Sequence, residues 1–177
     1  VYLTSRGIGV LEVNYGGSTG YGRGYRERLR GQWGIVDVED VVAAAVGLAD
    51  AGEADRSRLA IKGGSAGGWT VLAALARTDA FAAGISRYGV ADARALAEDT
   101  HDFESRYLDG MIGPLPEAEE TYRERSPLTH VDGFSAPVLL LQGSEDRVVP
   151  PSQSEAIRDA LAARGIPHAY RLYEGEG

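Results

Sequence analysis

One serine stands in a setting that suits nucleophilic chemistry. Ser65 lies within Gly63-Gly64-Ser65-Ala66-Gly67, which fits the pattern G-x-S-x-G. An apolar run typical of a strand precedes it, and a helical pattern follows at 67–77. A turn this tight strains the serine backbone and leaves space only for glycine or alanine beside it. The pattern predicts a hydroxyl raised above the carboxyl edge of a sheet, with the Ala66 N–H aimed at an oxyanion.

A glycine-rich turn between a strand and a helix has other uses, including phosphate binding and close packing of the helix. A phosphate loop needs a lysine and a hydroxyl residue directly after its glycines. Trp69 and Thr70 stand there instead. The dinucleotide pattern G-x-G-x-x-G is also absent from KGGSAGG. The sequence therefore favours the nucleophile over these alternatives.

A carboxylate that would orient a catalytic histidine follows later in the chain. Asp146 lies in QGSEDRVVPP, directly after the apolar run at 137–142. Serine hydrolases of α/β type carry their triad in the order Ser, Asp or Glu, His, with each residue beyond a strand. Asp146 fits that order, and Glu145 is a rival for the same role. The alternative for Asp146 is a carboxylate that shapes a turn or a helix start.

None of the three histidines suits the role of general base. His101 and His130 precede Asp146, and His168 opens the final strand, at the wrong edge of a parallel sheet. All three are interpreted as surface or hydrogen-bonded core residues. The acidic residues around His101 lack the spacing of metal ligands, so no metal is predicted. We expect the base to follow Gly177 and the 177 residues to be part of a longer chain.

The elements that position these residues alternate along the chain. Hydrophobic patterning predicts strands at 7–14, 58–62, 81–87, 137–142 and 168–173. It predicts helices at 36–51, 67–77, 91–99, 117–125 and 150–164, and a long glycine-rich loop at 15–31. Strands that alternate with crossover helices indicate an α/β fold with a mostly parallel sheet and helices on both faces. No linker interrupts 1–177, so a single domain is expected.

Composition excludes several classes of function. The net charge is −8, which disfavours binding to nucleic acid. No apolar run approaches the roughly 20 residues that cross a bilayer, so no membrane partner is expected. The chain has no cysteine, which excludes disulfides and thiolate chemistry and favours a cytoplasmic location.

Several stretches together resemble one family. The chain carries VNYGGSTGYGRGYRERLRGQWGIVDVEDV, GGSAGG, THDFESRYLDGMIGP, ERSPLTHVD, LLLQGSEDRVVPPSQ and a final YEGEG. They resemble the catalytic α/β-hydrolase domain of the prolyl oligopeptidase family of serine peptidases, in its acylaminoacyl-peptidase and dipeptidyl-peptidase-like branch. The resemblance covers nearly the whole chain.

The resemblance implies roles for particular residues. Ser65 would be the nucleophile, Ala66 an oxyanion-hole amide and Asp146 the acid. Tyr88 would lie in the wall of the pocket for the residue before the cut bond. Arg147 would hold the substrate backbone, although a surface ion pair explains it equally well. The family needs no metal or cofactor for this chemistry.

The resemblance also implies missing parts. In the family, the histidine lies just beyond YEGEG, and the second oxyanion donor and a β-propeller lie upstream of the position of Val1. The sheet would then lack its first strands and the helix after the histidine, so that 1–177 would be incomplete at both ends and inactive alone.

The function expected is hydrolysis of short peptides by a serine peptidase of oligopeptidase, acylaminoacyl-peptidase or dipeptidyl-peptidase type. A carboxylesterase or lipase-like hydrolase remains an alternative, because G-x-S-x-G does not distinguish esters from amides. A catalytically inert scaffold is the other alternative. Assembly of a homo-oligomer through the hydrolase domain is left open.

Overall fold

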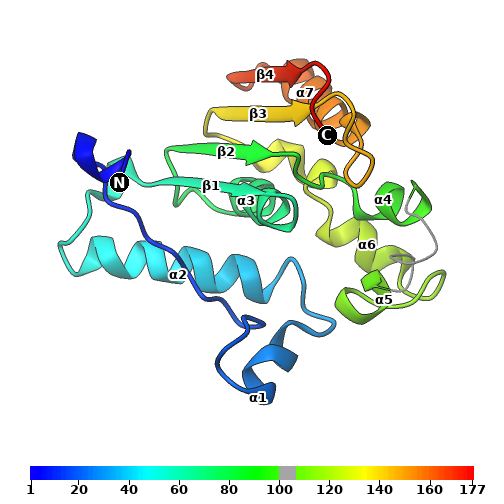
Figure 1. Cartoon of the computed structure of the whole chain (residues 1–177), viewed down its shortest axis with the longest axis horizontal. Coiled ribbons are helices and arrows are strands. Elements are labelled where there is room, and N and C mark those ends of the chain that lie inside the picture. The colour runs from blue at the N-terminus through cyan, green and yellow to red at the C-terminus, as the bar shows by residue number, and fades with distance from the viewer. Residues whose placement is uncertain (100–106) are drawn as a thin grey trace.

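The computed structural model describes residues 1–99 and 107–177 and contains one parallel sheet (Figure 1). The sheet of the described residues has four strands in the order β1-β2-β3-β4, and each strand pairs with the next in parallel. The strands are β1 Ala60–Gly64, β2 Ala83–Arg87, β3 Val138–Gly143 and β4 His168–Tyr173. Their carboxyl ends therefore form one edge, as a shared site requires.

Helices connect the strands. The α-helices are α1 Arg23–Arg26, α2 Val36–Asp50, α3 Ala66–Arg77, α4 Ala93–Asp99, α5 Tyr107–Met111, α6 Glu119–Arg125 and α7 Pro151–Ala163. Short 3₁₀ segments lie at Thr4–Arg6, Glu27–Leu29, Arg56–Arg58 and Pro127–Gly133. Among the described residues, no helix combines the length and the hydropathy that a bilayer crossing demands.

The main core lies between the sheet and two helices. Helix α3 packs on β1 and β2, and α7 packs on β3 and β4. Ile61, Val138 and Leu140 are buried on this side of the sheet, together with Ile157 and Leu161 of α7. Within the described residues α3 and α7 cover this same face. The side chains of the opposite face, which the sequence predicted to be covered as well, are half-buried or exposed.

The predicted elements are mostly confirmed, with boundaries displaced by one or two residues. The strand predicted at 168–173 matches β4, and the helix predicted at 36–51 matches α2. The predicted glycine-rich loop at 15–31 contains the short helix α1 and a 3₁₀ turn. Helix α5 was not predicted, because five residues are too few to show a helical period.

The strand predicted at 7–14 is wrong for the described residues. Residues 8–15 are not part of any helix or strand, and Ile8, Val10 and Leu11 are about half exposed. A run of β-branched residues forms a strand only when a neighbouring strand satisfies its backbone groups, and no described strand pairs with this one.

A second, smaller core lies beyond the carboxyl ends of the strands. Figure 1 shows α4, α5 and α6 gathered on the side toward which the strand arrows point. Its buried residues come from six separated segments of the chain and are Trp33, Trp69, Val90, Ala93, Leu108, Ile112, Tyr122 and Val149. This core closes one side of the edge where the sequence predicts the active site.

The first turn of α3 makes an unusually close approach to the segment after β2. A Cβ atom on Gly68 would lie 2.5 Å from the Cα of Gly89 and 2.8 Å from Oγ of Ser86, whereas a Cβ atom on Gly67 would meet nothing within 4 Å. The two neighbouring glycines thus differ in the space that a side chain would have.

We expect Gly68→Ala to reduce the stability of the full-length protein by about 1–3 kcal/mol, because the added methyl group forces the helix away from β2. Gly67→Ala is the matched control and should leave stability unchanged or raise it by up to about 1 kcal/mol through helix propensity. Thermal unfolding midpoints of the two variants test this. Equal midpoints would contradict the close packing.

Candidate active site

Ser65 forms a corner of a single residue between strand β1 and helix α3. Its backbone angles are φ 55° and ψ −121°, a region that residues with a side chain rarely adopt. Its N–H donates to the carbonyl of Arg87 at 3.0 Å, and its carbonyl accepts from the N–H of Trp69 at 3.1 Å. These bonds hold the strained corner against both β2 and α3 and place Ser65 at the carboxyl edge of the sheet.

The corner is as crowded as the sequence predicts. A Cβ atom on Gly63 would lie 2.3 Å from the carbonyl oxygen of Gly67. Since backbone atoms on both sides make this contact, no side-chain movement relieves it. Position 63 therefore requires glycine, which is stricter than the predicted glycine or alanine, whereas position 67 has open space around it.

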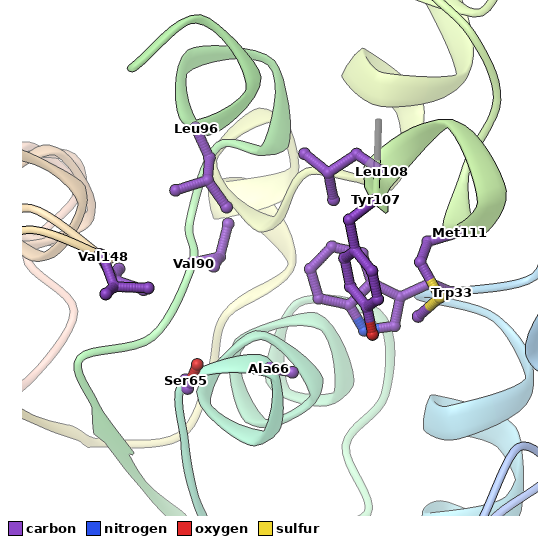
Figure 2. Close-up of a pocket in the computed structure, with 10 residues that line it drawn as sticks. Trp33, Ser65, Ala66, Val90, Leu96, Tyr107, Leu108, Met111 and Val148 are labelled. Carbon is purple, nitrogen blue, oxygen red and sulfur yellow. The ribbon is translucent and has the colours of Figure 1, made fainter. Parts of the chain in front are cut away.

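Ser65 and Ala66 open onto an apolar cavity of about 140 Å³ (Figure 2). In Figure 2 the Ser65 hydroxyl lies on the side of Val148, and Trp33, Tyr107 and Met111 gather beyond Ala66. The other lining residues are Val90, Leu96, Leu108, Val148 and Val149. Apart from the serine hydroxyl and backbone groups, the wall offers a substrate mainly apolar contact.

Ala66 is the first residue of α3. The N–H groups in the first turn of a helix have no acceptor within that helix, and the helix dipole favours negative charge near them. The Ala66 N–H therefore suits an oxyanion that forms beside Ser65.

Asp146 lies in the loop between β3 and α7, close to the cavity wall. Its Oδ1 accepts from the N–H groups of Val148 and Val149, each at 2.9 Å. The buried Gln142 donates from Nε2 to the carbonyl of Val149 at 3.1 Å and accepts from Ser154 of α7 at 2.7 Å. Hydrogen bonds to Asp146 and from Gln142 thus both hold the loop. Asp146 lies two and three residues before Val148 and Val149, which line the cavity.

The other two residues that the sequence predicted for substrate binding lie outside the cavity lining. The ring of Tyr88 lies against Gly64, where an added Cβ atom would be 3.0 Å from the Tyr88 hydroxyl. Tyr88 also has a positive φ of 38° and is 38% exposed. Arg147 is exposed on the loop between Asp146 and Val148. Their predicted roles stay predictions.

The described histidines do not approach Ser65. The ring of His130 contacts the carbonyl of Glu124, and Nδ1 of His168 lies 2.8 Å from the carbonyl of Ile166 at the amino end of β4. His101 and the acidic residues after it lie outside the described residues. In the part of the chain that is described, no three His, Asp or Glu side chains gather to hold a metal ion.

The aromatic wall of the cavity was not predicted from the sequence. Trp33 lines the cavity and stacks on Trp69 of α3, with ring centroids 4.5 Å apart and planes at 20°. The backbone N–H of Trp33 donates to the carbonyl of Met111 at 3.2 Å, which connects α5 to the same wall. A tryptophan followed by a glycine just before a helix was the available signal for Trp33, whereas Tyr107 and Met111 carried none.

The strained serine lies between a strand and a helix of a parallel sheet, beside a helix N-terminus, and a carboxylate follows a later strand. This arrangement is that of the α/β-hydrolase fold. Comparison with known proteins gives the family. The model of the prolyl oligopeptidase family of peptidases matches residues 1–177, and the chain belongs to that family.

Relatives and solved structures agree with this assignment. The chain is 32% identical to dipeptidyl aminopeptidase BIII of Pseudoxanthomonas mexicana, over 99% of this chain and 26% of that protein. It superposes on a puromycin-hydrolyzing peptidase of Mycobacterium tuberculosis with a TM-score of 0.97 and 64% identity, over 99% of this chain and 27% of that one. An acylaminoacyl peptidase of Pyrococcus horikoshii gives a TM-score of 0.85 and 30% identity, over 93% and 27%. The predicted α/β-hydrolase fold is confirmed, and the chain spans about a quarter of the length of these proteins.

The backbone of Ser65 generates a prediction about stability. Ser65→Gly and Ser65→Ala both remove the hydroxyl, but only glycine adopts a positive φ without steric cost. Strain of about 1–3 kcal/mol at such a position outweighs the roughly 0.5–1 kcal/mol of backbone entropy that glycine loses on folding. We expect Ser65→Gly to unfold at the higher temperature in paired thermal melts. A lower midpoint for Ser65→Gly would show that the corner is not strained.

Proposed function

We propose that the enzyme containing this chain is a serine peptidase that hydrolyses short peptides by acyl transfer. Ser65 is the nucleophile, the N–H of Ala66 is one oxyanion donor, and Asp146 is the acid that orients the base. One observation carries the proposal: the strained corner places Ser65 and Ala66 in the wall of the same apolar cavity as Val148 and Val149, whose N–H groups Asp146 binds.

We propose that the general base is a histidine just beyond Gly177. The N–H of Glu145 donates to the carbonyl of Glu176 at 2.8 Å, and a Cβ atom on Gly177 would lie 3.3 Å from the carbonyl oxygen of Glu145. The segment that follows β4 thus runs beside the residue that precedes Asp146. A residue that continued from it would start beside Glu145, the neighbour of Asp146 in the chain.

In the mechanism proposed, the Ser65 hydroxyl attacks a peptide carbonyl as the histidine takes its proton. The tetrahedral oxyanion is stabilised by the Ala66 N–H and by a second donor from outside residues 1–177. The histidine returns the proton to the leaving amine, and water then hydrolyses the acyl-enzyme. Asp146 keeps the imidazole in the required tautomer throughout.

Names of the relatives support peptides as the substrate class. The matched proteins are named a dipeptidyl aminopeptidase, acylamino-acid-releasing enzymes and a puromycin-hydrolyzing peptidase. We transfer from these names only hydrolysis by a peptidase. A preference for the amino end of a peptide, or for blocked amino ends, depends on parts of the enzyme outside this chain.

A cytoplasmic location and a homo-oligomer formed through this domain are further parts of the proposal. The absence of cysteine fits a reducing compartment, where disulfides do not persist. Fractionation of cells and the molar mass of the full-length enzyme in solution decide these two points.

Substitution of the proposed triad residues tests the mechanism in the full-length enzyme. Ser65→Ala should abolish covalent labelling by a fluorophosphonate probe and lower kcat by on the order of a millionfold. Asp146→Asn should lower kcat by on the order of 10⁴-fold, because the imidazole loses its orienting charge. Exposed Glu145 supplies the matched control, and Glu145→Gln should leave kcat close to that of the unaltered enzyme. Labelling of Ser65→Ala would disprove the nucleophile, and loss of activity in Glu145→Gln alone would move the acid to Glu145.

The apolar cavity predicts selectivity for the residue before the cut bond. Peptidyl p-nitroanilides with Phe or Leu at that residue should exceed those with Asp in kcat/KM by about 100-fold or more, since a carboxylate would be desolvated without a partner. Equal rates would place that side chain outside the cavity. Matched p-nitrophenyl esters, if turned over in the absence of anilide hydrolysis, would favour the alternative of a carboxylesterase.

A further inference from the structure

Asp37 is a fully buried carboxylate in the first turn of α2. Its Oδ1 accepts from the N–H of Gly34 at 2.6 Å, and its Oδ2 accepts from Oγ1 of Thr70 at 2.6 Å. Burial raises the pKa of Asp37, and the hydrogen bonds from Thr70 and Gly34 oppose that change. Carboxylates are rarely buried to this degree without a specific partner, and the mechanism above does not use this one.

The hydrogen bond between Thr70 and Asp37 holds the helix that carries the proposed oxyanion donor, the N–H of Ala66. Thr70 lies one turn after Ala66 in α3, and its Oγ1 is 3.2 Å from the carbonyl oxygen of Ala66, a second acceptor near the same hydroxyl proton. The shorter bond to Asp37 therefore anchors the first turn of α3 to α2. That turn carries the Ala66 N–H and follows directly on Ser65.

The hydrogen bond between Gly34 and Asp37 holds the turn that carries Trp33, a residue of the cavity wall. Gly34 follows Trp33, and a Cβ atom on Gly34 would lie 3.1 Å from the indole of Trp69. Two guanidinium groups hold the same turn: Arg77 donates to the carbonyl of Gly34 at 2.5 Å, and Arg125 donates to the carbonyl of Trp33 at 3.1 Å. Burial lowers the pKa of Arg77, and the negative charge of Asp37 acts in the opposite direction.

We propose that Asp37 is a positioning residue for the reaction proposed above, acting through Thr70 on the first turn of α3 and through Gly34 on Trp33. Asp37 makes no contact with the reacting groups. A strained corner persists only where its surroundings determine it fully, and an oxyanion donor works only at a defined distance. One carboxylate thereby fixes the helix start that bears the donor and the indole that borders the substrate cavity. The proposal rests on Ser65 as the nucleophile.

Thr70→Val tests the arm that reaches α3. Valine keeps the shape of threonine and removes the hydroxyl, so that the helix start loses its anchor. We expect kcat toward a peptidyl p-nitroanilide, and the rate of fluorophosphonate labelling, to fall by about 10-fold or more with a smaller change in KM. Thr70→Ser, which retains the hydroxyl, should restore both rates to within a few-fold of the unaltered enzyme.

Thr78→Val is the matched control for the loss of a threonine hydroxyl at α3. Thr78 follows the last turn of the same helix and donates to the carbonyl of Ala74 at 2.9 Å, far along α3 from Ser65. This variant should keep both rates.

Asp37→Asn is the second test of the proposal, for use if Thr70→Val does not fold. Asparagine keeps the shape of aspartate and removes its charge. We expect this variant to lower kcat and raise KM together, because the bonds to Thr70 and to Gly34 are both affected.

The outcomes separate this proposal from the proposed function. If Thr70→Val and Asp37→Asn keep normal kcat, KM and labelling rates while their melting temperatures fall, the network is structural alone and the positioning role is refuted. In that case an inactive Ser65→Ala still supports the proposed function. Full activity of Ser65→Ala would refute both.

Discussion

The structure depends on one constraint, the reversal of the chain between β1 and α3 within a single residue. Such a corner forces a positive φ on Ser65 and brings the backbone of Gly63 against the carbonyl of Gly67. The same corner fixes how closely α3 lies on β2, since the next turn meets Gly89. A strained serine at this point is held by strand, helix and neighbouring strand together, so its hydroxyl has little freedom to leave the edge of the sheet.

Buried side chains hold the loops at this edge. Gln153 of α7 accepts from the N–H groups of Ala91 and Asp92 at 2.9 and 2.8 Å and donates to the carbonyl of Asp92 at 3.1 Å. Gln142 of β3 donates to the carbonyl of Val149 in the loop that carries Asp146, and it accepts from the hydroxyl of Ser154 in α7. Backbone groups in loops require partners when they are buried. Here side chains of the sheet and of α7 are the partners of these loop backbone groups. The cavity wall is thereby connected to the rigid part of the fold.

Charged side chains beside the second core also bind backbone groups of a loop. Asp37, Arg77 and Arg125 are directed to the turn before α2, and each binds backbone groups of that turn. Asp37 is buried, whereas Arg77 is exposed and Arg125 is half-buried. The nearby guanidinium charges reduce the cost of burying the carboxylate. The result is a wall that combines an aromatic surface toward the cavity with a hydrogen-bonded polar layer behind it.

The sequence by itself determined the alternation of strands and helices, the candidate nucleophile and the candidate acid. These features are local: a glycine-rich corner has its own pattern, β3 is mostly a continuous apolar run, and α7 shows a helical period within its thirteen residues. Tertiary structure alone decided that residues 8–15 are not a strand, that Trp33 and Tyr107 line the cavity while Tyr88 does not, and that Asp37 bonds to Thr70. Each of these depends on contact between segments distant in the chain, and a contact of that kind leaves no periodic trace in a single sequence.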